Sequence, residues 1–218
     1  MRNLIIIGAG GLGKEAAWTA LAMNRAYSGL DRWQLLGFAD DDAKLLQHQV
    51  FDLPVLGRPE EIGTENGPLW FHCAIGDNQR RRSLAKRCLR LNWRPATLIH
   101  PSVIRANNIV IGEGVYIGAG TIINPDVRVG DFVLINQRVA VGHDATLEDW
   151  CQLNPGAQIN GQCQVGPGAT IGSNASLHPG VRIGAHAVVG SNSQVLRDVT
   201  PDTTVNGVPA HPIYKKRK

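Results

Sequence analysis

The sequence predicts two architectures in succession: an α/β unit over residues 1–95 and an all-β parallel β-helix over residues 96–218. Three observations predict them. Apolar residues recur every six positions from Ile99 to Val199, glycines punctuate this repeat, and the N-terminus opens with an apolar strand that runs into a glycine-rich turn. A period of six is typical of stacked β-coils, and a glycine-rich turn after a strand is typical of α/β folds.

The six-residue repeat decides the second architecture. Its first position is Ile, Leu or Val except at Arg105, its second is often Gly, and its fifth is nearly always small or β-branched. A helix with 3.6 residues per turn would spread this stripe around its surface, whereas a short strand followed by a corner fits the period. Three such faces close a triangular coil of about 18 residues. Cys151 and Cys163 occupy fifth positions, so we expect small apolar fillers there rather than thiol chemistry.

The N-terminal unit has the layout of half a Rossmann fold. A strand over residues 2–7 leads into glycines that match GxGxxG and then into a helix that ends near Met23. Such glycines let the backbone approach a diphosphate at the helix N-terminus. Strands over 34–39 and 69–75 follow, the first of them ending in acids of the kind that bind a ribose hydroxyl. Three strands with crossover helices suffice for one nucleotide but not for a dinucleotide, and tight-turn glycines without any ligand remain the alternative.

Charge and hydropathy limit the partners. The net charge of +4 depends on a C-terminal tail, Lys215–Lys218, and on the run Arg80–Arg82. We expect the tail to be a solvated end, and no aromatic residues interleave with the basic ones as they do in nucleic-acid binders. No apolar run is long enough to span a membrane and no signal-peptide layout is present, so we expect a cytoplasmic protein. The cysteine spacing contains no CxxC, which argues against a zinc site.

Six runs in order along the chain carry a family resemblance: GAGGLGKE, FADDD, AIGDN, LIHPS, VAVGHD and NGVPAHPI. They resemble the PglD/NeuD-type sugar acetyltransferases, which are hexapeptide-repeat acyltransferases. The resemblance implies that the β-helix is left-handed, against the usual crossover rule. It also implies a homotrimer that takes acetyl-CoA as co-substrate between adjacent β-helices, while the N-terminal unit holds a nucleotide-linked amino sugar.

The same resemblance assigns site residues. His143 is the expected general base and Asp144 the acid beside it, because a histidine can accept a proton at neutral pH and a carboxylate can orient its ring. The substrate contacts implied are Gly10, Gly11, Leu12, Asp40, Asp41, Gly76 and Asn136. The acetyl-CoA contacts implied are Gln152, Ser173 and Ser191. No metal is expected.

Coil stacking adds one residue to this set. Residues 18 apart lie on neighbouring coils, so Gly161 is expected beside His143, where we hypothesise that it makes room for the thioester arm, and Asn136 is expected over Asn154. Leu12 and Gln152 depart from the family, which often has His at both positions.

Four functions remain open from the sequence. The leading one is an acetyl-CoA-dependent N-acetyltransferase that acts on a nucleotide-linked amino sugar, of the UDP-4-amino-sugar type, for surface glycan biosynthesis. The second is an O-acetyltransferase of sialic acid or a related sugar, which Leu12 keeps open. The third is a non-catalytic trimer that binds a sugar nucleotide. The fourth, a redox enzyme that uses the glycine-rich turn, is disfavoured by the half-size first unit.

Overall fold

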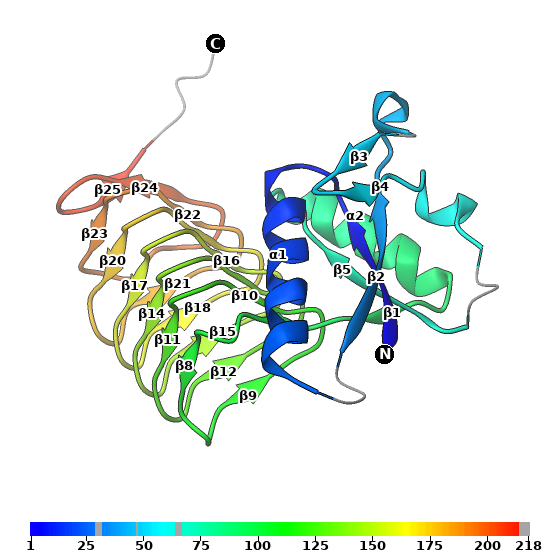
Figure 1. Cartoon of the computed structure of the whole chain (residues 1–218). Coiled ribbons are helices and arrows are strands. Elements are labelled where there is room, and N and C mark those ends of the chain that lie inside the picture. Colours follow the sequence, from blue (N-terminus) through cyan, green and yellow to red (C-terminus); the bar gives the residue numbers. More distant parts are fainter. Residues whose placement is uncertain (29–31, 47, 64–66, 214–218) are drawn as a thin grey trace, which may run out of the picture. The chain divides into compact units, whose positions relative to one another are not determined.

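The computed structural model describes residues 1–28, 32–46, 48–63 and 67–213 (Figure 1). The chain forms two compact units, Met1–Pro101 and Ser102–Lys218. The division lies slightly after the residue 95 at which the repeat pattern placed it. The basic tail Lys215–Lys218, expected to be a solvated end, lies outside the described residues.

The first unit is built on a parallel sheet in the order β2-β1-β5-β6. Its strands are β1 (Arg2–Ile7), β2 (Trp33–Ala39), β5 (Leu69–Cys73) and β6 (Arg94–Pro95), and its α-helices are α1 (Gly11–Ala26) and α2 (Asn78–Arg90). Strand β6 was not predicted. It pairs with Trp70 and Phe71 of β5 over two residues only, and its Pro95 is tolerated because the strand lies at the sheet edge.

The connection from β2 to β5 differs from the expected crossover helix. Its described residues form two 3₁₀ turns, η2 (Ala43–Leu45) and η3 (Pro59–Glu61), and a hairpin of β3 (Gln49–Val50) with β4 (Leu53–Pro54). Prolines at 54 and 59 interrupt any helical run here, because proline lacks the backbone N–H and clashes with the preceding turn. Strand β7 (Leu98–Ile99) follows β6 and packs against α1.

The core of the first unit contains three polar side chains that are fully buried, Thr19, His72 and Arg81. Residues Leu4–Ile7 of β1 are buried between the helices, as an apolar strand of a parallel sheet should be. Arg81 donates from Nη1 to the Ile75 carbonyl (2.9 Å), and His72 donates from Nδ1 to the Ala96 carbonyl (2.9 Å). Burial lowers the pKa of His72 to about 4, so this imidazole is neutral in the folded protein.

The second unit consists of three sheets of very short parallel strands, stacked coil upon coil (Figure 1). The first sheet contains β10 (Tyr116–Ile117), β13 (Leu134–Ile135), β16 (Gln152–Leu153), β19 (Thr170–Ile171), β22 (Val188–Val189) and β24 (Thr204–Asn206), with β25 (His211–Pro212) antiparallel at its end. The second contains β8 (Ile104–Arg105), β11 (Ile122–Ile123), β14 (Ala140–Val141), β17 (Gln158–Ile159), β20 (Ser176–Leu177) and β23 (Gln194–Val195). The third contains β9 (Val110–Ile111), β12 (Arg128–Val129), β15 (Thr146–Leu147), β18 (Gln164–Val165) and β21 (Arg182–Ile183).

The hexad positions fill the interior of this prism as predicted. From Val115 on, side chains at the first and fifth positions are buried, as at Ile135, Leu153, Cys151 and Cys163. On the first coil Arg105 is exposed and Ile111 is half-buried. As far as β23 each coil is in register with the next at a separation of 18 residues, as in the pair Val141 and Ile159. The last turn of the prism shortens this separation to 16, as in the pair Val189 and Val205. Both cysteines are free thiols inside the prism, where they act as small apolar residues.

The buried His72 makes the stability of the first unit depend on pH. Its pKa is about 4 in the folded state against an ordinary 6.5, so between these values the unfolded chain binds the proton and the folded chain does not. The stabilisation is therefore complete above pH 6.5 and is lost as pH falls towards 4, by about 3 kcal/mol. Urea unfolding at several pH values should show a shallower pH dependence for His72→Asn, which retains a side-chain N–H. Equal slopes for both proteins would contradict this assignment.

Candidate active site

His143 lies at the corner between the second and third sheets and pairs with the next residue. Its Nδ1 lies 2.7 Å from Asp144 Oδ2, and both side chains are more than half exposed (63% and 53%). Because a carboxylate can only accept at neutral pH, Nδ1 is the donor and a neutral ring keeps the lone pair of Nε2. Asp144 takes the left-handed conformation (φ 58°), which is tolerated best by Asp, Asn and Gly. The pair leaves one ring nitrogen able to accept a proton.

Gly161 lies one coil beyond His143, as the 18-residue spacing predicted. A Cβ on Gly161 would lie 2.6 Å from His143 Nε2 and 2.8 Å from Cε1. The coils are joined here by the bond from Gln162 N to the His143 carbonyl (2.8 Å). In this structure the space above Gly161 is occupied by the imidazole itself, and the hypothesis that Gly161 gives room to a thioester remains a prediction.

Other predicted residues lie at a different corner of the same prism, between the first and second sheets. Asn136, which is nearly buried, donates to the Leu153 carbonyl (3.0 Å) and stacks over Asn154 (3.4 Å). Gln152 donates to the same Asn154 oxygen (2.8 Å), so one amide links two residues that the sequence assigned separately to substrate and acetyl-CoA. Strand β14 separates this corner from His143.

Ser173 and Ser191 follow β19 and β22 on this second corner. They belong to successive coils, since Asn192 N donates to the Ser173 carbonyl (2.8 Å). The structure therefore divides the residues predicted in the second unit into two groups. One is His143, Asp144 and Gly161, and the other is Asn136, Gln152, Ser173 and Ser191.

The first unit contains a cavity of about 380 Å³ at the carboxyl ends of its parallel strands. The six residues predicted for substrate in this unit all line it, namely Gly10, Gly11, Leu12, Asp40, Asp41 and Gly76. Ligands of open α/β sheets bind at this end of the strands. All six residues predicted to contact the substrate in this unit therefore surround a single cavity.

The N-terminus of α1 gives this cavity an anion-binding character. Its N-cap is Gly10, which offers no side-chain cap, and its first turn contains no acid. The close approach of α1 to β1 requires Gly13, because a Cβ there would collide with the Gly8 carbonyl oxygen. Asp40 Oδ2 accepts from Ala9 N (2.9 Å) and so holds the turn that leads into the helix. Uncapped N–H groups and the helix dipole favour a bound phosphate here.

Nine residues that line the same cavity were not predicted for the site, among them Pro59, Asp77, Arg80 and Leu84. Arg80 belongs to the basic run Arg80–Arg82, which predicted only a charge. It lies in the first turn of α2, where its backbone N–H donates to the N-cap Asp77, and it lines the cavity. Pro59 belongs to the irregular connection that the sequence did not predict. The arginine run could have signalled Arg80, and the AIGDN run could have signalled Asp77, whereas Pro59 and Leu84 carry no such signal.

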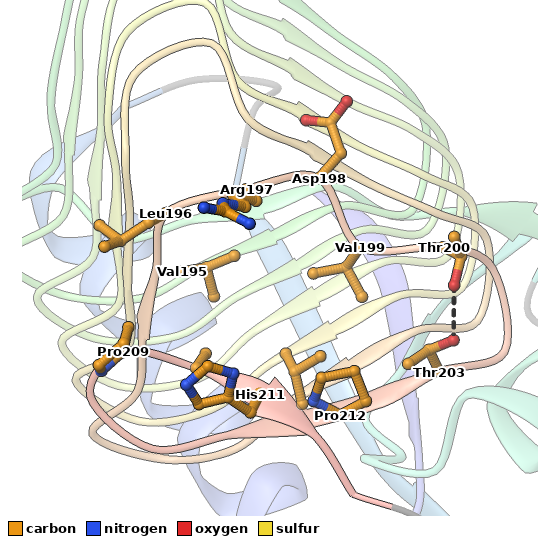
Figure 2. A pocket seen from close by; sticks show the side chains of 12 residues that line it. Val195, Leu196, Arg197, Asp198, Val199, Thr200, Thr203, Pro209, His211 and Pro212 are labelled. Atoms are coloured by element: carbon orange, nitrogen blue, oxygen red, sulfur yellow. Dashed lines mark hydrogen bonds between the residues drawn. The ribbon is translucent and has the colours of Figure 1, made fainter.

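A second cavity, of about 430 Å³, lies at the C-terminal end of the prism and contains none of the predicted residues (Figure 2). Figure 2 shows Val195 and Val199 inside the outline of the last coil, with Thr200 bonded to Thr203 at the rim (2.8 Å). These valines are the last apolar layer of the coil interior, so the cavity is the end of the stack.

No group of three or more His, Cys, Asp or Glu side chains among the described residues is placed to hold a metal ion. None of the helices in the described ranges is long and apolar enough to cross a membrane.

Comparisons with known proteins agree with the fold. Residues 3–88 match the PglD N-terminal domain and residues 162–197 match the bacterial transferase hexapeptide. No match is found among curated proteins. A mutant of perosamine N-acetyltransferase from Caulobacter crescentus, solved with CoA and GDP-perosamine, is 30% identical over 99% of this chain and 98% of its own, with a TM-score of 0.88. The acetyltransferase domain of PglB from Neisseria gonorrhoeae, solved with acetyl coenzyme A, is 28% identical over 97% and 99%, with a TM-score of 0.86.

The fold and these matches define a hexapeptide-repeat acyltransferase with a left-handed β-helix, so the predicted hand is confirmed. The chain belongs to the PglD/NeuD-type family of sugar acetyltransferases. WeeI from Acinetobacter baumannii, at 23% identity and a TM-score of 0.87, has the same fold.

The contact between Gly161 and His143 makes a first prediction about activity. In Gly161→Ala the new methyl group would overlap His143 Nε2, so the ring must turn away from its present position. Because small displacements of a reacting group are costly, we expect acetyl transfer to fall by roughly ten- to a hundredfold. Pro179→Ala, at the equivalent position one coil further, is the control and should keep normal turnover. Normal turnover and an unchanged unfolding midpoint in Gly161→Ala would contradict the expected role of this contact.

Proposed function

We propose that this protein transfers the acetyl group of acetyl-CoA to the amino group of a nucleotide-linked amino sugar, with His143 as general base. The observation that carries the proposal is the His143–Asp144 pair, which fixes the imidazole through Nδ1 and leaves Nε2 as the proton acceptor. The relatives support the choice of co-substrates, since one was solved with CoA and GDP-perosamine and another with acetyl coenzyme A.

The chemistry needs only one proton acceptor. The sugar amine attacks the thioester carbonyl carbon, a C–N bond forms, the C–S bond breaks and CoA leaves as the thiol or thiolate. His143 Nε2 takes the proton that the amine loses, and Asp144 holds the ring in position while the imidazolium exists. Transfer is direct in this scheme, with no thiol intermediate. Burial raises the pKa values of Cys73 (to about 12), Cys88 and Cys163, which makes these thiols poor nucleophiles.

The cavity of the first unit is the proposed site for the nucleotide. The diphosphate would lie at the N-terminus of α1, next to Gly10, Gly11 and Leu12, with Arg80 as a nearby cation. Asp40, Asp41 and Gly76 would contact the nucleoside. Leu12, which replaces a frequent family histidine, lines this cavity and is therefore proposed to affect the choice of sugar nucleotide.

We also infer that the working form is a homotrimer. His143 and the proposed acetyl-CoA contacts Gln152, Ser173 and Ser191 lie on two corners of one prism, separated by β14. A site that uses both groups forms when one corner of a prism faces the other corner of a second copy. Such a heterologous contact closes into a ring under threefold symmetry.

Removing the proposed base gives the direct test. His143→Asn should lower kcat by roughly 10²- to 10⁴-fold, since a general base contributes about that much. Free thiol release from acetyl-CoA is measured with UDP-, GDP- and dTDP-linked 3-amino and 4-amino sugars, and with free sialic acid. His186→Asn is the matched control, because His186 lies at a different corner in a left-handed conformation that Asn tolerates.

The outcomes separate the competing functions. Turnover on an amino sugar that His143→Asn loses and His186→Asn keeps supports the proposal. Turnover on sialic acid alone would replace it by O-acetylation. No turnover on any acceptor would leave a sugar-nucleotide-binding trimer as the better account.

A further inference from the structure

Arg87 of α2 joins two segments that are far apart in the sequence. Its Nη1 and Nη2 bond to Asp41 Oδ2 and Oδ1 (2.7 and 3.0 Å), and its Nε and Nη2 bond to Glu60 Oε1 and Oε2 (2.7 and 2.6 Å). Both carboxylates are thus held by two bonds each from one planar guanidinium. A planar fork of this kind fixes the orientation of a carboxylate, which a single ammonium group does not.

The residues that Arg87 holds form part of the cavity wall. Asp41 lines the cavity directly, and Glu60 follows Pro59, which lines it too. On α2 itself, Arg80 and Leu84 line the cavity and Arg87 continues the same helical face at the spacing i, i+4, i+7. Arg87 therefore lies behind the wall of the cavity and connects three of its segments: the end of β2, the turn η3 and helix α2.

Electrostatics gives Arg87 a second effect. Asp40, Asp41 and Asp77 all line the cavity, and Glu60 lies next to it, so carboxylates outnumber cations around the proposed diphosphate site. The bonds from Arg87 lower the pKa of Glu60 to about 2, which means that Glu60 stays charged and paired at neutral pH. Without the guanidinium, Asp41 and Glu60 would repel each other and the anionic ligand.

A purely stabilising role explains these contacts less well. The Asp41 and Glu60 side chains are almost half exposed (45% and 46%), so solvent screening limits what these two pairs add to folding even in bidentate geometry. Their geometric effect on Asp41 is direct, since both carboxylate oxygens are bonded.

We propose that Arg87 is a positioning residue for nucleotide recognition, which holds Asp41 and the Pro59–Glu61 turn in the orientation that the nucleoside part of the substrate contacts. This inference rests on the proposed function, because it assumes that the cavity binds a nucleoside diphosphate. Arg87 itself lies behind Asp41 and acts through it.

The test compares Arg87→Lys, Arg87→Met and the control Arg82→Lys, an exposed arginine on the same helix. Arg87→Lys keeps the charge but loses the fork, and Arg87→Met loses both. We expect the KM for the nucleotide sugar to rise about tenfold in Arg87→Lys and further in Arg87→Met, with kcat and the KM for acetyl-CoA unchanged. Glu60→Gln in the Arg87→Met background removes the repulsion and should recover part of the loss.

Binding of UDP and GDP by calorimetry separates this inference from the proposed function. If the unmodified protein binds neither nucleotide and shows no turnover, the proposed function fails and the role of Arg87 fails with it. If the unmodified protein binds and turns over while Arg87→Lys and Arg87→Met match it in KM, only the role of Arg87 is overturned. If kcat falls and both KM values rise to a similar extent, with a lowered unfolding midpoint, Arg87 has a structural role instead. That result would also overturn the proposed positioning role.

Discussion

The stacking of coils at a separation of 18 residues, kept as far as β23, is the constraint on which the second unit depends. Interior side chains of one coil lie on those of the next, and backbone hydrogen bonds join the coils at every strand. The register therefore determines which corner residues meet. His143 lies against Gly161 and Asn136 lies over Asn154 for this reason alone. A one-residue slip would exchange interior and exterior side chains and would also separate His143 from Gly161.

The first unit depends on a different kind of constraint, the convergence of strand ends. Parallel order β2-β1-β5 brings the glycine turn, the acids after β2 and the Gly76 turn to one edge. There the N-terminus of α1 favours an anion while Asp40 and Asp41 supply acceptors. The two carboxylates are not equivalent, since Asp40 bonds to backbone N–H groups at Ala9 and Asp42, and Asp41 bonds to Arg87. Asp40 holds the glycine turn in its conformation, whereas Asp41 is bonded to Arg87 of helix α2.

Much of this could be predicted because it is periodic or local. The hexads predicted the prism and the contact of His143 with Gly161. The strand–glycine–helix pattern predicted a ligand site at the carboxyl ends of the strands of the first unit. Strand β6 was not predicted, because a strand of two residues carries no apolar pattern. The prediction of a helical crossover from β2 to β5 was wrong, because Pro54 and Pro59 interrupt this segment. Arg87 was missed because its partners are 46 and 27 positions away. His143 and Gln152 lie on different faces of the prism, because successive hexads belong to successive sheets. A list of residues with a period of six does not show this until each hexad is assigned to its sheet.

We propose that catalysis combines two corners from two copies of the chain, and co-expression of two inactive variants can test this proposal. His143→Asn removes the base and Ser173→Tyr blocks the proposed acetyl-CoA corner, each on a separately tagged chain. If the site forms between copies, about a quarter of the interfaces in evenly mixed trimers regain both intact corners, and acetyl transfer should recover accordingly. If mixed assemblies carrying both tags stay as inactive as each parent, the site lies within one copy and the proposed site between copies is wrong.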